Sequence, residues 1–186
     1  MCKRAKKKEK EIWHGLPEER FKAYRNWRTP RGYLCGTYAA SVLLAYYQDY
    51  VDEQMIPSFI RQKKATDGAT LAAFLQLFIQ RYGMPTIAFQ VAHGVSSFLG
   101  RYQQNVRARA TLIGGWQRAV KRIDQGKPVI IGLNKLCGST YGNHWVVAYA
   151  YKETATGERY FKVHDNWGSY CAVIPAKWVN GTVSLP

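Results

Sequence analysis

Three side chains that can cooperate in nucleophilic catalysis occur in order along the chain: Cys35, His144 and Asp165. Cys35 follows a turn that contains proline and glycine, and it begins a strongly apolar segment, so we expect it at the start of a helix. Unpaired N–H groups and the macrodipole at a helix N-terminus favour negative charge. The sequence therefore predicts a lowered pKa for this thiol and a raised thiolate fraction.

His144 and Asp165 are expected on neighbouring strands. His144 begins an apolar segment directly after a loop over 138–143 that contains glycine and serine, a junction where a base can be both rigid and accessible. If the hairpin between the two strands has an even-numbered loop, side-chain alternation puts Asp165 on the side of His144 and points His164 and Asn166 away. An odd-numbered loop or a bulge would reverse this assignment.

Each of these residues also has a purely structural interpretation. A free cysteine packs as a small hydrophobic side chain, a histidine can simply occupy a strand edge, and Asp165 with Asn166 can supply turn chemistry. The combination is more specific than its parts. A cysteine that opens a helix, then a histidine on a late strand, then an acid or amide on the next strand, is the arrangement of cysteine–histidine catalysis.

Apolar spacing and chain breakers predict the elements that position these residues. Four helices are expected in the first half, over 17–27, 35–50, 57–64 and 69–82. Two more helices are expected later, over 95–102 and 115–125. Strands are predicted over 86–91, 129–133, 144–152, 159–165, 170–174 and 179–184, with a hairpin connection over 154–158. Helices first and an antiparallel sheet second indicate an α+β fold.

Four short motifs in this order resemble those of papain-like cysteine peptidases. They are Cys35-Gly36 with the apolar run over 39–44, Gly126-Lys127-Pro128-Val129-Ile130-Ile131, His144-Trp145-Val146-Val147, and Asp165-Asn166-Trp167-Gly168. The resemblance covers roughly 32–178 and looks closest to the bacteriocin-processing (double-glycine) peptidases and their stand-alone bacterial relatives. It implies a papain-like fold, with the nucleophile at the start of a helix that packs on a C-terminal antiparallel sheet.

The resemblance also implies a role for each matching residue. Cys35 matches the nucleophile, His144 the base, and Asp165 the acid that orients the base. Trp167 matches an indole that shields the histidine–acid hydrogen bond from water, and Asn166 stands beside it as a supporting residue.

The chain departs from the family pattern before the nucleophile. The family usually has a glutamine about six residues before the cysteine, where its side chain lines the oxyanion hole. Here that position is Thr29, and the nearest amide side chain is Asn26. Losing one oxyanion donor costs about 100- to 1000-fold in turnover. Either Asn26, Thr29 or a main-chain N–H replaces the glutamine, or the activity is weak or absent.

Composition predicts the domain organisation and some binding properties. Of the 186 residues, 47% are apolar, which suits a single domain over 13–186. The segment 1–12 is expected to be a frayed basic arm, because its first ten residues hold six lysines or arginines and one acid. The formal net charge of +15 and this arm suggest an acidic partner. A second basic stretch runs from Arg101 to Lys127, but no nucleic-acid-binding motif accompanies it.

Localisation and ligands are less constrained. No apolar run approaches the roughly 20 residues of a membrane span, and no signal peptide is visible. The sequence predicts a cytoplasmic protein if it is complete and a secreted one if a leader has been removed. The four cysteines lack metal-like spacing, so neither a metal nor a cofactor is expected. Cys137 and Cys171 could pair in an oxidising compartment and are expected as free thiols otherwise.

Four functional hypotheses follow. The leading one is a cysteine peptidase or amidase that acts on a peptide or protein through a Cys35 thioester. An acyl transferase on the same scaffold would use an amine in place of water. A catalytically inactive relative would keep the fold and bind an acidic partner through its basic surface, while nucleic-acid binding rests on charge alone.

Overall fold

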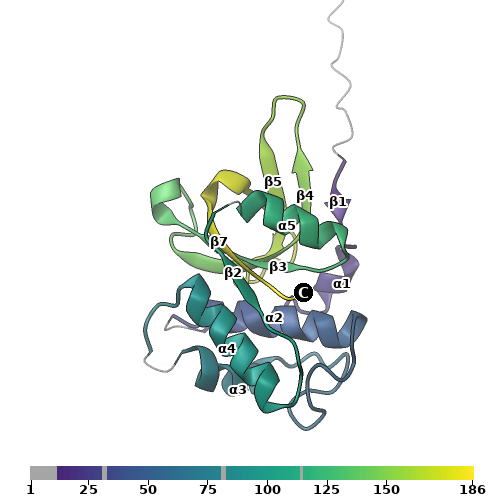
Figure 1. The fold of residues 1–186 in the computed structure, drawn as a ribbon. Coiled ribbons are helices and arrows are strands. Elements are labelled where there is room, and N and C mark those ends of the chain that lie inside the picture. Colours follow the sequence, from purple (N-terminus) through teal and green to yellow (C-terminus); the bar gives the residue numbers. More distant parts are fainter. Residues whose placement is uncertain (1–11, 31–32, 81–82, 114) are drawn as a thin grey trace, which may run out of the picture.

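The computed structural model describes residues 12–30, 33–80, 83–113 and 115–186. N-terminal helices pack on a C-terminal antiparallel sheet (Figure 1), which confirms the predicted α+β class. All but the last residue of the predicted basic arm lies outside the described residues. No helix in the described ranges is long and apolar enough to cross a membrane.

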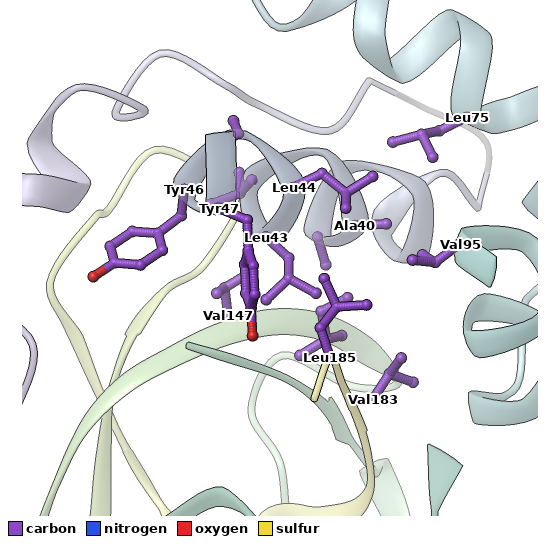
Figure 2. Close-up of a cluster of buried hydrophobic side chains, with 14 of the residues drawn as sticks. Ala40, Leu43, Leu44, Tyr46, Tyr47, Leu75, Val95, Val147, Val183 and Leu185 are labelled. Carbon is purple, nitrogen blue, oxygen red and sulfur yellow. The ribbon is translucent and has the colours of Figure 1, made fainter. Parts of the chain in front are cut away.

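The helix α2, Cys35–Tyr50, is central to the fold, and its bounds are those predicted. Nearly all of its side chains are buried, because it lies between the sheet on one side and the helices α3, Ala69–Ile79, and α4, Ala88–Arg101, on the other. Figure 2 shows Leu43 and Tyr47 pointing from α2 toward the strands, while Leu44 extends toward the two other helices. The first residue of α2 is thereby held against the sheet by a large apolar core.

The sheet has the strand order β2-β7-β3-β4-β5-β6, and all its pairings are antiparallel. The strands are β1 His14–Gly15, which pairs with β4, β2 Arg109–Thr111, β3 Val129–Leu133, β4 His144–Glu153, β5 Arg159–His164, β6 Ala172–Pro175 and β7 Val179–Ser184. The helix α5, Gly115–Asp124, covers the opposite face from α2 and buries Ala119 and Ile123 there. Helices therefore cover both faces of the sheet.

Three predictions about elements were wrong or too long. The helix expected over 17–27 is only the short α1, Glu19–Lys22, because turns closed by hydrogen bonds between residues three apart follow it. The segment 57–64 forms turns rather than a helix. The strand predicted over 86–91 is instead the loop before α4 and the first turns of that helix. Its start is stabilised by Gln90, whose Oε1 accepts the Ile87 N–H at 2.9 Å, and helix spacing buries Val91, Val95 and Phe98.

The register of the β4–β5 hairpin decides which side chains face one another. The loop between the paired residues Glu153 and Arg159 has five residues, and a bulge lies between Ala148 and Ala150. Either irregularity alone would move Asp165 to the face opposite His144, but together they cancel. Continued by one pair beyond Val147↔His164, the register places Asp165 opposite Val146, on the His144 side.

Candidate active site

Cys35 is the first residue of α2 and is partly buried. Main-chain N–H groups of Trp145, Gly36 and Cys35 itself interact with its sulfur and lower its pKa, but burial has the larger effect and raises the pKa above the ordinary value. The predicted lowering of the Cys35 pKa was therefore wrong for the free protein, because the thiolate loses more hydration than the helix start returns. The amide of Trp145 brings the sulfur beside the residue that follows His144.

His144 begins β4 and is only 4% exposed. Its Nε2 lies 2.7 Å from the main-chain carbonyl oxygen of Asp165. A carbonyl oxygen can only accept a hydrogen bond, so Nε2 must carry the proton and donate it. In the neutral ring Nδ1 then has a free lone pair. Burial lowers the pKa of His144, which the hydrogen bond and the charge of Asp165 only partly oppose, so the neutral form is favoured.

The carboxylate of Asp165 does not make the hydrogen bond to His144. Its Oδ1 accepts the N–H groups of Trp167 and Ser169 at 2.8 and 2.9 Å, and its Oδ2 accepts the Tyr141 hydroxyl at 3.3 Å. The carboxylate thus shapes the turn after β5, and this turn presents the main-chain carbonyl to the imidazole. The sequence predicted a contact between Asp165 and His144, but through the carboxylate of Asp165 rather than its main-chain carbonyl.

Two aromatic rings cover His144. The Trp167 ring centroid lies 4.1 Å from that of the imidazole, and the Tyr141 ring is parallel to the imidazole at 5.9 Å. Trp167 remains 52% exposed, so it separates His144 from solvent, in the place where the sequence predicted a shielding indole. Tyr141 was not predicted. It lies in the loop before β4, and its hydroxyl donates a hydrogen bond to the Asp165 carboxylate. Burial and, to a smaller extent, the charge and hydrogen bond of Asp165 raise the pKa of Tyr141 to about 12.

Asn166 connects three segments of the chain by hydrogen bonds. It is fully buried and adopts a left-handed backbone conformation with φ of 59°, which asparagine tolerates better than most residues. Its Nδ2 donates to the Trp145 carbonyl at 2.9 Å, and its own carbonyl accepts the Thr29 N–H at 2.8 Å. The side chain therefore holds the start of β4 in place.

The two candidates for the missing oxyanion donor have different surroundings. Thr29 is attached to the site through Asn166, and its hydroxyl is buried without a hydrogen-bond partner among the described residues. Asn26 is exposed in the turn after α1. An unsatisfied buried hydroxyl is costly, so a ligand oxygen beside Thr29 would relieve a deficit, whereas Asn26 has none to relieve.

His164, which the sequence predicted to point away from His144, makes structural contacts. Its Nε2 contacts the Tyr24 carbonyl at 2.8 Å, and its Nδ1 contacts Asn166 Oδ1 at 2.9 Å. It is fully buried, and burial lowers its pKa. Both ring nitrogens are thus engaged away from Cys35. Cys137 and Cys171 are free thiols, as is Cys35, and the described residues contain no cluster of three metal-binding side chains.

The raised pKa of Cys35 makes a kinetic prediction. Only the thiolate reacts with iodoacetamide, so alkylation of Cys35 should accelerate with pH and reach half its maximal rate above about pH 8.5, the ordinary thiol value. The measurement is the rate of mass increase in a variant that keeps Cys35 alone among the four cysteines. N-acetylcysteine serves as the reference thiol. A rate that is already maximal below pH 7 would contradict the effect of burial.

Comparison with known proteins identifies a family and a similar fold. Residues 19–179 match the model of the Peptidase_C39 like family. A Bacillus anthracis protein whose crystal structure is described as that of a C39-like peptidase superposes with a TM-score of 0.51 and 13% identity, over 83% of this chain and 88% of the other. The match to a recombinant stem bromelain precursor covers 94% of this chain and 77% of the other at 11% identity, with a TM-score of only 0.39.

No curated protein has a significantly similar sequence. The family match extends over most of the chain, from α1 to the start of β7, and includes Cys35, His144 and Asp165. The chain therefore belongs to the Peptidase_C39 like family and has the papain-like cysteine peptidase fold.

Proposed function

We propose that the chain is a cysteine peptidase or amidase that cleaves a peptide or amide bond through a thioester on Cys35. Family membership indicates a cysteine peptidase and a peptide substrate. The observation that carries the finer proposal is the tautomer of His144. Its Nε2–H is held by an acceptor-only carbonyl, which leaves the Nδ1 lone pair free to accept a proton from the thiol.

The proposed reaction has two halves. The Cys35 thiol transfers its proton to His144 Nδ1, and the sulfur attacks the substrate carbonyl to form a tetrahedral oxyanion. The imidazolium then donates the proton to the leaving amine, the C–N bond breaks, and a thioester remains. Water attacks the thioester and gives a proton to His144, which returns it to the sulfur as the acid product leaves.

Burial of the pair is consistent with this sequence of steps. Both Cys35 and His144 are shifted toward their neutral forms by desolvation, so both groups are neutral in the resting site. Proton transfer then accompanies the attack. The roles assigned to Tyr141 and Trp167 are positional, because their rings exclude water from the imidazole and restrict its rotation.

The oxyanion would be stabilised by donors near the start of α2. The main-chain N–H of Cys35 is one candidate, since the first N–H groups of a helix lack partners within it. Of the two side chains predicted as a second donor, the buried, unpartnered hydroxyl of Thr29 is the better supported.

Product analysis tests the proposal. A mixture of unrelated peptides is incubated with the chain at pH 8, and new termini are identified by mass spectrometry. Hydrolysis should release an acid and an amine from the same bond. Added glycine amide should trap part of the acyl group if the thioester forms, and quantitative trapping with no acid product would favour the acyl transferase. Absence of any cleavage or adduct would favour the inactive, binding relative.

A further inference from the structure

A groove runs between α4 and the chain that leads into β2. Its volume is about 760 Å³, and both walls contain small residues, among them Ser96 and Gly100 on α4 and Ala108 and Ala110 on the opposite wall. Figure 1 shows the chain turning back after α4 so that β2 runs beside it.

One wall of this groove is the edge of the sheet. β2 is the terminal strand in the strand order and pairs only with β7 within the described part of the chain. The main-chain N–H of Ala108, just before β2, already donates toward α4, to the Ser96 hydroxyl at 3.0 Å. Because amide directions alternate along an extended chain, the main-chain groups of Ala110 point the same way. An edge strand with its polar groups available can bind an extended peptide.

The charge of the groove is positive. Arg107 and Arg109 are exposed and line it, whereas no aspartate or glutamate does. Neither arginine forms an ion pair with the described residues. Nearby, Arg118 hydrogen-bonds a hydroxyl group, with its Nε 3.3 Å from Ser184 Oγ. Burial lowers the pKa of Arg118, and the charges of Arg122 and Arg109 lower it further. Several positively charged side chains therefore lie close together here, and no described carboxylate lines the groove beside them.

The segment that leads into α4 contacts the candidate active site and is followed by the first residues of the groove. The first wall residue of the groove, Phe89, lies two positions after Ile87, and Thr86 precedes both. A Cβ on Gly36, next to Cys35, would lie 2.4 Å from Thr86 Oγ1, and the Thr86 carbonyl accepts the Trp145 indole N–H at 3.1 Å. The start of α4 therefore joins the nucleophile to the groove.

We propose that the groove between α4 and β2 is an exosite that binds an acidic segment of the substrate in extended form. The inference rests on the proposed function, which supplies a peptide substrate. The 14 residues of α4 span about 20 Å, which matches about six residues of an extended chain. The acidic side chains pair with Arg107 and Arg109, and the main chain hydrogen-bonds to the sheet edge.

Binding can be measured without turnover. The probe is a fluorescein-labelled ten-residue peptide of alternating glutamate and valine, and its fluorescence anisotropy is followed with the full chain carrying Cys35→Ala. We expect saturable binding that weakens at least tenfold in a variant with Arg107→Glu and Arg109→Glu. The matched control carries Arg25→Glu and Lys177→Glu, which change the net charge equally at exposed sites outside the groove and should bind as before.

A second variant tests the groove without changing charge. Nothing lies within 4 Å of a Cβ built on Gly100, so Gly100→Trp should fold normally and fill the groove, while Gly100→Ala should leave it open. We expect at least tenfold weaker binding only for the tryptophan. Thermal melting of each variant confirms that it is folded.

Three results would overturn the proposal: equal weakening in both double variants, unchanged binding with Gly100→Trp, or equally tight binding of an alternating lysine–valine peptide. Tighter binding of a ten-residue oligothymidylate than of the acidic peptide would assign the groove to nucleic acid instead. Binding by a chain that never cleaves a peptide would leave the exosite standing and refute the proposed function. Cleavage without such binding would refute the exosite and leave the proposed function standing.

Discussion

Replacing Cys35 with alanine should abolish acyl-enzyme formation completely. The thioester needs a sulfur at the start of α2. Neither of the other two cysteines in the described residues is equivalent, because Cys137 is exposed in the loop before β4 and Cys171 lies beyond the turn that holds Asp165. The measurement is the intact mass of the chain after reaction with an activated ester such as p-nitrophenyl acetate. The wild type should gain one acetyl group that hydroxylamine removes, and the variant should gain none.

The other thiols provide the control for this experiment. Variants with Cys137→Ala or Cys171→Ala should acylate at the wild-type rate, since neither thiol meets His144. Peptide mapping should locate the acyl group on Cys35 in both. Acylation that persists in Cys35→Ala, or that maps to Cys137, would place the nucleophile elsewhere and remove the central element of the proposed mechanism.

Replacing His144 with alanine should lower turnover by about 100- to 10,000-fold, the usual contribution of a positioned acid–base group. The loss affects both halves of the reaction, because the same imidazole removes the thiol proton and protonates the leaving amine. The measurement is kcat/KM for whichever peptide the wild type cleaves. Circular dichroism should show a folded variant, since the ring occupies the strand end rather than the main core clusters.

Asp165→Asn is the matched comparison for His144→Ala. The asparagine keeps the main-chain carbonyl that holds Nε2, and its side-chain oxygen can still accept the N–H groups of Trp167 and Ser169. We expect a loss below tenfold, whereas sites whose carboxylate directly orients the base lose about 10,000-fold on amide substitution. A loss of that size here would show that the carboxylate, not the carbonyl, orients His144 during turnover.

The same comparison has a signature in the pH profile. The negative charge of Asp165 raises the pKa of His144 against the dominant effect of burial. Removing this charge should lower the His144 pKa further, so the acid limb of kcat/KM should move to lower pH in Asp165→Asn. A limb that moves to higher pH would contradict the electrostatic assignment.

Much of the fold follows from local pattern. The bounds of α2, β3 and β7 agree with the predicted ranges, because a dense apolar helix and short β-branched strands between glycine or proline breakers leave few alternatives. The start of α4 was predicted as a strand, because Thr86, Ile87, Phe89 and Val91 look β-like locally. Packing against α3 and the sheet favours the helix instead, since tertiary burial outweighs small differences in propensity.

Sequence motifs were enough to predict the family and the α+β class, and they proposed Cys35, His144 and Asp165 as residues whose types suit nucleophilic catalysis. What the sequence by itself could not determine was how the atoms of these three residues meet. Two irregularities in the β4–β5 hairpin cancel, and the turn after β5 then directs the Asp165 carbonyl, rather than its carboxylate, at His144. The Cys35 pKa likewise depends on how much water the assembled fold removes from the sulfur. The Asp165–His144 contact and the Cys35 pKa both depend on contacts between segments that are distant in sequence, so local sequence patterns do not predict them.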